Sequence, residues 1–256
     1  MKVSEAIIQY LVEYGVDKIF TISSNTIAPL LDSILNHKNL QMIHGQQETM
    51  VAFMAAGYAR ATNSLGVMIV GSGPGLTNSI TGVTSAYFES IPLLVLGGEV
   101  ARQSFGRGAL QEGSSYELNI ISMFRSVTKY QAEIVNANSA LSILRKAINT
   151  AMSGRKRPVL VTLPVDIALQ DIGIVAESGS FAHNLSIDKT TLSGLMDRIS
   201  EARRPMLLAG SGVRSAGAAS LLTQFVEKYS IPSATTMKAK GVIPESHSLS
   251  LGTYGF

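Results

Sequence analysis

Residues 47–100 read QETMVAFMAAGYARATNSLGVMIVGSGPGLTNSITGVTSAYFESIPLLVLGGEV, and this stretch decides the fold of the chain. Its apolar spacing predicts a helix over 48–61, a strand over 66–71, a helix over 76–88 and a strand over 93–96. Strands that alternate with helices in this way indicate crossover units of a parallel sheet. The turn at 71–75, GSGPG, lies where a strand feeds a helix, which is where open parallel sheets bind ligands.

The same alternation continues on both sides of this stretch. Before it we predict a strand over 18–22, a helix over 27–36 and a strand over 41–44, and after it a helix over 140–152 and a strand over 158–163. The fold class is therefore α/β: a parallel sheet flanked by helices on both faces, followed by a partial second α/β domain. We expect the first domain over 1–170, a linker rich in Ser, Gly and Asn over 171–188, and the partial domain over 189–256.

In the partial domain the sequence predicts a helix over 192–202, a strand over 206–210, a turn over 210–217 and a helix over 218–229. Only two strands of a second sheet are expected to be complete. Because a two-stranded sheet is marginal alone, part of this domain is expected to be missing or to be supplied by a partner.

Composition excludes several classes of function. Of 256 residues, 46% are hydrophobic and the net charge is +3, but the basic clusters at 155–157 and 203–204 lack aromatic neighbours, so no nucleic-acid partner is expected. Cysteine is absent and the four histidines have no zinc-ligand spacing, so no metal-binding residue is predicted. With no run of 18 apolar residues and no leader pattern at its start, the chain is expected to be cytoplasmic and without a membrane partner.

Three features are candidates for function, and each has a plainer explanation. Glu48 opens an apolar helix, where it is either a buried acid that binds a heterocycle or a first-turn acid that complements the helix dipole. The turn at 71–75 either lets a ligand touch bare backbone or serves packing alone, and Leu76 stands where a dinucleotide fingerprint needs its third glycine. The loop RGALQEGSS at 107–115 is either functional or merely solvated. No serine is framed as Gly-x-Ser-x-Gly, which argues against an α/β hydrolase.

Taken together, these segments resemble the amino-terminal half of the thiamine-diphosphate-dependent acetolactate synthase family, over essentially the whole chain. The ordered motifs that carry the resemblance are the helix over 48–62, GSGPGLTN at 71–78, AYFESIPLLVLGGEV at 86–100, RGALQE at 107–112, PVLVTLPVD at 158–166, RRPMLLAGSGVRSAGA at 203–218 and TTMKAKGVIPESHSLSLGTYG at 235–255.

The resemblance implies an enzyme that decarboxylates a 2-oxo acid on thiamine diphosphate and transfers the acyl or hydroxyalkyl fragment. Glu48 matches the family's glutamate ten residues before Tyr58, and is implied to hydrogen-bond a ring nitrogen of the aminopyrimidine. Gln111 matches a glutamine near the reacting carbon, although Leu110 replaces the family's aromatic residue. The residues predicted to bind the cofactor are Ser23, Ser24, Asn25, Gly73, Pro74, Gly75 and Asn78.

Departures from the family pattern limit what the resemblance implies. The segment over 21–25, TISSN, replaces Gly-x-Pro-Gly-Gly and should narrow or polarise the pocket, and Gln47 replaces the histidine that usually precedes the glutamate. The flavin-associated turns match only in part, at 210–213 and at Thr235, Thr236 and Lys238, which leaves FAD binding open.

The family's domain for the diphosphate and Mg²⁺ does not occur in this sequence. The chain is therefore expected to be either one subunit of a split enzyme, whose partner chain in a homo- or hetero-oligomer brings that domain, or a truncated product. One alternative is a non-catalytic regulatory or binding module derived from such an enzyme. Another is a dinucleotide binder.

Overall fold

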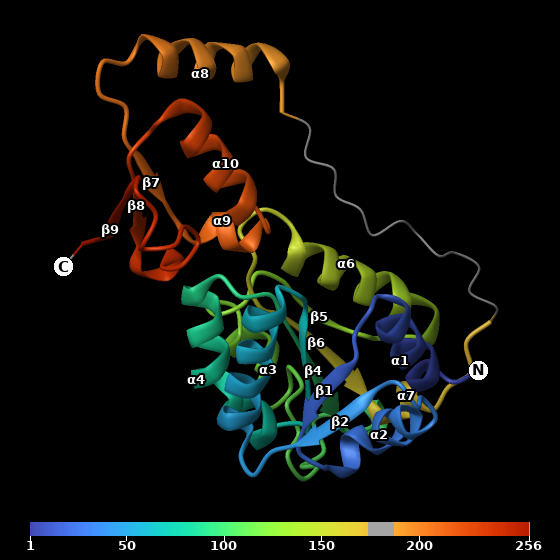
Figure 1. The fold of residues 1–256 in the computed structure, drawn as a ribbon. Helices are drawn as coiled ribbons and strands as arrows, with labels where there is room; N and C mark the ends of the chain where they lie inside the picture. The colour runs from blue at the N-terminus through green and yellow to red at the C-terminus, as the bar shows by residue number, and fades with distance from the viewer. Residues whose placement is uncertain (174–186, 256) are drawn as a thin grey trace. The chain divides into compact units, whose positions relative to one another are not determined.

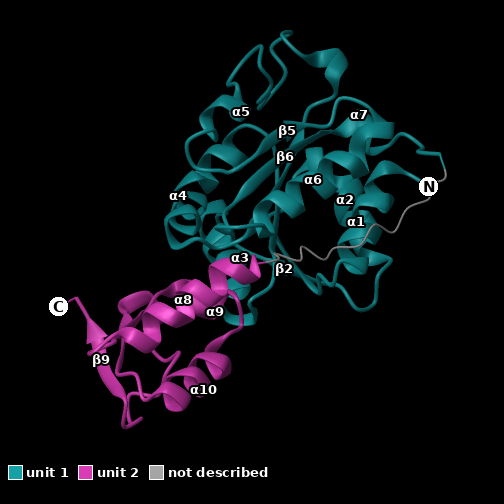
Figure 2. Cartoon of the chain, turned by 90° about the horizontal axis from the view of Figure 1, so that it is seen from above, with its two compact units in different colours: residues 1–182 teal, residues 183–256 magenta. Residues whose placement is uncertain are grey.

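The structure is a computed structural model that describes residues 1–173 and 187–255 (Figure 1). The chain divides into two compact units, residues 1–182 and 183–256, which are coloured separately in Figure 2. Most of the predicted linker over 171–188 lies outside the described residues.

A six-stranded sheet in which every pair of neighbouring strands is parallel forms the centre of unit 1, in the order β2-β1-β3-β4-β6-β5. The predicted parallel α/β fold is confirmed. The strands are β1 (Lys18–Thr21), β2 (Gln41–His44), β3 (Gly66–Val70), β4 (Leu93–Glu99), β5 (Gln131–Glu133) and β6 (Val159–Pro164). The sequence did not predict β5, because its three half-buried residues carry no apolar alternation.

Helices cover both faces of this sheet, in two separate apolar cores. One face packs against α1 (Val3–Glu13), α2 (Ala28–Leu35), α6 (Ala140–Met152) and α7 (Val165–Ala168), and the other against α3 (Glu48–Thr62) and α4 (Pro74–Glu89) (Figure 1). The short helix α5 (Ile120–Met123), labelled in Figure 2, packs on the same face as α3 and α4. All five residues of β3 are buried, with Ile69 in one core and Met68 and Val70 in the other. A fully buried side chain of this kind contributes about 1.5–3 kcal/mol, which explains the unbroken apolar runs of the central strands.

Helices α3 and α4 pack closely because α4 contains Gly82. A Cβ atom built on Gly82 would lie 2.5 Å from the Cβ of Ala52, 2.9 Å from the carbonyl oxygen of Thr49 and 3.3 Å from the backbone nitrogen of Phe53. Only a residue without a side chain permits this approach. The contact fixes the first turn of α3, which carries Glu48, against α4.

Unit 2 contains a parallel sheet of three strands in the order β7-β8-β9, so the expectation of two complete strands is wrong. The sequence located only the first strand of this sheet, over 206–210, and neither β8 nor β9. Strand β9 pairs with β8 across a register shift and contains Gly252 at φ +78°, which obscures its apolar pattern. The predicted turn over 210–217 is also wrong in part, because its residues 211–215 form a short helix. The elements are α8 (Lys189–Glu201), β7 (Leu207–Ala209), α9 (Ser211–Ser215), α10 (Ala219–Tyr229), β8 (Ser233–Thr236) and β9 (Ser250–Tyr254).

Candidate cofactor site at the carboxyl edge of unit 1

The strand order of unit 1 reverses between β1 and β3, since the chain runs outward from β1 to β2 and then returns to the other side of β1. At such a switch point the loops after the two strands open a crevice at the carboxyl edge of the sheet. Here these loops are residues 22–26 and 71–75. They contain most of the residues that the sequence predicts for cofactor binding.

Ser24 and Thr26 join the first loop to the second. A Cβ on Gly71 would lie 2.7 Å from the Cβ of Ser24, so the absent side chain admits Ser24 against the turn. The Oγ1 atom of Thr26 accepts a hydrogen bond from the backbone nitrogen of Ser72 at 3.3 Å. The two other predicted residues of this loop, Ser23 and Asn25, are exposed. The serine-rich segment therefore packs against the glycine turn through Ser24, with its neighbours at the surface.

Gly73 allows the loop over 107–115 to approach the glycine turn at 71–75. Its φ is +52°, and a Cβ there would lie 2.6 Å from the carbonyl oxygen and 3.2 Å from the Cα of Gln111. Gln111 itself has φ +63°, a conformation that is uncommon for a non-glycine residue and often marks functional sites. The structure thus places the backbone of Gln111 directly on the predicted turn, with its side chain exposed.

Glu48, the first residue of α3, is half-buried in this chain rather than buried as its apolar helix suggested. The side-chain amide of Asn78 donates a hydrogen bond to its Oε2 atom at 3.1 Å, and the hydroxyl of Thr49 donates to the carbonyl of Asn78. The other oxygen, Oε1, lies 3.9 Å from where a Cβ of Gly75 would be. No residue within 1–173 or 187–255 donates a hydrogen bond to Oε1. One oxygen orients the carboxylate, and the other remains available beside bare backbone.

Two buried acids lie at the same edge, and the sequence did not single them out as site residues. Glu99, the last residue of β4, is 1% exposed, and its Oε1 accepts hydrogen bonds from the backbone nitrogens of Val100 at 2.8 Å and Gly113 at 3.1 Å. Glu112 accepts from the backbone nitrogen of Gly106 and from the hydroxyl of Ser114. For Glu99 the available signal was a carboxylate at the carboxyl end of an apolar strand, where ligands bind in parallel sheets.

Burial raises the pKa of Glu99 above its usual range. The hydrogen bonds from Gly113 and Val100 act in the opposite direction, and the charges of Glu133 and Glu112 raise the pKa further. Burial also raises the pKa of Glu133, which the charge of Arg102 lowers. The carboxyl edge of β4 and β5 therefore disfavours further negative charge.

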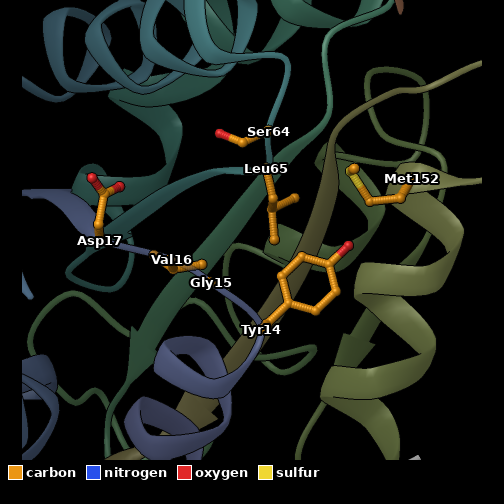
Figure 3. Close-up of a pocket in the computed structure, with 7 residues that line it drawn as sticks. All are labelled: Tyr14, Gly15, Val16, Asp17, Ser64, Leu65 and Met152. Atoms are coloured by element: carbon orange, nitrogen blue, oxygen red, sulfur yellow. The ribbon is translucent and has the colours of Figure 1, made fainter. Parts of the chain in front are cut away.

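A cavity of about 320 Å³ lies elsewhere in unit 1 (Figure 3). Its lining residues precede β1 and β3 or end α6, so the cavity belongs to the amino edge of the sheet, opposite Glu48: Tyr14, Gly15, Val16, Asp17, Ser64, Leu65 and Met152. The Asp17 carboxylate is already hydrogen-bonded to Tyr58 and Lys18. None of the predicted cofactor residues lines this cavity, and the candidate site remains at the carboxyl edge.

Within residues 1–173 and 187–255, no three His, Cys, Asp or Glu side chains are grouped as a metal site would require. In the same ranges no helix combines the length and the apolar content needed to cross a bilayer.

Comparison with known proteins identifies the family. The N-terminal TPP binding domain of thiamine pyrophosphate enzymes matches residues 1–118, and the central domain of the same enzymes matches residues 192–256. The chain belongs to the thiamine pyrophosphate enzyme family.

Among named members of that family, the chain is similar to acetolactate synthase large subunits. It is 34% identical over 256 residues to that of Lactococcus lactis subsp. lactis, covering 98% of this chain and 44% of the relative. It is 33% identical over 267 residues to a probable acetolactate synthase large subunit of Methanocaldococcus jannaschii, covering 100% of this chain and 43% of that protein. The chain thus spans less than half the length of these relatives.

The fold has a counterpart in a solved structure. The X-ray structure of a proposed thiamin diphosphate-dependent enzyme isolated from Mycobacterium smegmatis superimposes with a TM-score of 0.89 at 22% sequence identity, covering 99% of this chain and 48% of that one. This structural likeness independently supports the α/β fold class.

Two of the positions whose partial match leaves FAD binding open lie at the same edge of the second sheet. Gly210 follows β7, and Thr235 lies on β8 in register with Ala209. Both positions are at the carboxyl ends of parallel strands, where ligands bind in such sheets. FAD binding stays a prediction.

Proposed function

We propose that this chain binds the aminopyrimidine ring of thiamine diphosphate at the carboxyl edge of unit 1, as part of an enzyme that decarboxylates a 2-oxo acid and transfers the fragment. The observation that carries the proposal is the Glu48 carboxylate, with Oε2 held by Asn78 and Oε1 available beside Gly75. A ring nitrogen needs one such acceptor next to backbone that a flat ring can approach. The similarity to acetolactate synthases supports the reaction class.

Each residue then has a defined role. Glu48 would hydrogen-bond a ring nitrogen, Asn78 would keep its carboxylate in place, and the turn at 73–75 would lie against the ring. Gln111 would face the reacting end of the site from its loop. When bound, thiamine diphosphate supplies the electron sink for loss of carbon dioxide from a 2-oxo acid.

The proposal includes a second polypeptide chain, which completes the cofactor site. The resemblance to thiamine-diphosphate enzymes implies a separate domain for the diphosphate and Mg²⁺, which faces the ring-binding domain. We place the Mg²⁺ and the diphosphate on a partner chain that faces the crevice of unit 1, in a homo- or hetero-oligomer. The half-buried state of Glu48 fits this arrangement, because a partner that covers the crevice would also bury the acid.

The test begins with a tagged form of the full chain, purified from its native cells together with any protein bound to it. The purified assembly is assayed for carbon dioxide release from pyruvate with thiamine diphosphate and Mg²⁺. Glu48→Gln should lower turnover about 100-fold or more, a typical loss when a proton-transfer or orienting group is removed. Glu13→Gln, an exposed acid on α1, is the matched control and should leave turnover unchanged.

Two results would contradict the proposal. Near-normal turnover by the Glu48→Gln assembly would remove Glu48 from the chemistry. A chain that purifies without a partner and whose melting temperature ignores thiamine diphosphate with Mg²⁺ would instead favour a non-catalytic binding module.

A further inference from the structure

Glu99 lies where the rigid centre of unit 1 meets the loop that carries Gln111. It ends β4, a strand whose seven residues are all buried between two neighbouring strands. Its Oε1 atom accepts one hydrogen bond from the next backbone nitrogen, Val100, and one from Gly113, 14 residues further along the chain. The sheet thus presents a fixed acceptor to a loop that is distant in sequence.

On the loop side, Gly113 is shaped for this contact. A Cβ at this position would lie 2.8 Å from Oε2 of Glu99, 2.7 Å from the side chain of Ile120 and 3.4 Å from the backbone nitrogen of Gly73. Gly113 therefore lies between the buried acid, the start of α5 and the glycine turn. No other residue type fits there without moving one of the three.

Glu112 forms hydrogen bonds that connect residues within the loop. Its carboxylate accepts from the backbone nitrogen of Gly106 at 2.9 Å and from the hydroxyl of Ser114. Ser114 in turn accepts from the backbone nitrogen of Tyr116 at 3.2 Å. Residues 106–116 are thereby tied together, and a hold on Gly113 constrains the whole segment, including Gln111.

We propose that Glu99 is a positioning residue: its carboxylate oxygen holds the loop over 106–116, and with it Gln111, against the glycine turn at 71–75. The catalytic meaning of this hold rests on the proposed function, because Gln111 matters for the reaction only if the cofactor binds at this edge. The contact between Glu99 and the loop forms within this chain and does not depend on the cofactor or on a partner.

Hydrogen exchange measured by mass spectrometry on the full chain, without cofactor or partner, tests the proposal independently of the Glu48 assignment. Glu99→Ala should speed amide exchange over 106–116 by about tenfold, since the amide of Gly113 loses a buried acceptor. Glu99→Gln should stay within about threefold of the wild type, because its amide oxygen can accept the same two hydrogen bonds. Glu117→Ala, at an exposed acid directly after this loop, is the matched control and should match the wild type.

Two further measurements complete the test. Exchange over α1, on the other face of the sheet, establishes that each variant is folded. Gly113→Ala keeps Glu99 but displaces the loop, so it should speed exchange over 106–116 as Glu99→Ala does. Unchanged exchange in Glu99→Ala would overturn the proposal, as would a Gln variant that loosens the loop as much as Ala. If Glu99→Ala does not fold, wild-type protection in Gly113→Ala would overturn it as well.

Discussion

Replacing Gly82 by alanine tests the contact that sets α3 against α4. The added carbon would lie 2.5 Å from the Cβ of Ala52 and 2.9 Å from the carbonyl oxygen of Thr49. Carbon atoms in favourable contact are about 3.5–4.0 Å apart, so the first distance is short by roughly 1 Å. Neither neighbour is the end of a flexible side chain, and the two helices must move apart.

The expected cost follows from two opposing effects. Overpacking of this kind costs about 1–3 kcal/mol, while alanine in a helix interior is favoured over glycine by about 1 kcal/mol. Because the obstructing atoms belong to backbone or to Cβ, the upper half of the packing cost applies and the net loss is about 1–2 kcal/mol. The same strain should loosen the first turn of α3, which carries Glu48.

A matched control lies on the facing helix. Gly57 is exposed within α3, and a Cβ there would meet no atom within 4 Å, so Gly57→Ala should stabilise the chain by about 1 kcal/mol. Urea unfolding followed by far-ultraviolet circular dichroism gives the free energies, and hydrogen exchange over 48–62 and 74–89 assigns the change to unit 1. A Gly82→Ala chain as stable as Gly57→Ala would refute the close-packing argument.

Three further predictions concern Gly73, Glu99 and Arg157. Gly73→Ala should lower the free energy of unfolding by about 1–3 kcal/mol and raise exchange around Gln111, because a Cβ at φ +52° would lie 2.6 Å from that residue's carbonyl oxygen; normal urea stability would contradict this. The pKa of Glu99 is higher in the folded chain than in the unfolded one, so the stability it contributes is present at low pH and lost as pH rises through the folded-state pKa. Glu99→Gln should remove that loss, and parallel pH–stability curves for the two proteins would count against it. Arg157→Ala should cost about 0.5–2 kcal/mol in a thermal or urea melt, since the guanidinium lies 3.8 Å from the ring centre of Tyr87, whereas Arg155→Ala, exposed next to it, should cost less.

Most of unit 1 was predictable because burial on both faces of a parallel sheet leaves a strong pattern. The strand over 41–44 and the helix over 140–152 were predicted with the boundaries that the structure has. β5 was missed because a short edge strand needs little apolar content, and β9 was missed because its pairing with β8 depends on a register shift. Pairing between strands distant in sequence is a tertiary property that local patterns do not encode.

The candidate site was predictable to the level of its turns and loops. Glycines in the turn at 71–75 signalled close approach, and the structure places Glu48 on one side of that turn and the backbone of Gln111 on the other. The sequence did not indicate that Asn78 holds the Glu48 carboxylate or that Glu99 binds Gly113. Both are contacts between segments separated by other elements, and their geometry emerges only when the sheet is assembled.

The strand order of unit 1 also has a consequence during synthesis on the ribosome. Within the described residues β5 pairs only with β6, which also covers the open side of β4. The 25 residues between Glu133 and Val159 take about 1–5 s to translate at about 5–20 residues per second. For that interval β5 has no neighbouring strand and the apolar edge of β4 is uncovered. The nascent chain therefore passes through a stage at which chaperone binding or a lower growth temperature should decide how much folded protein is recovered.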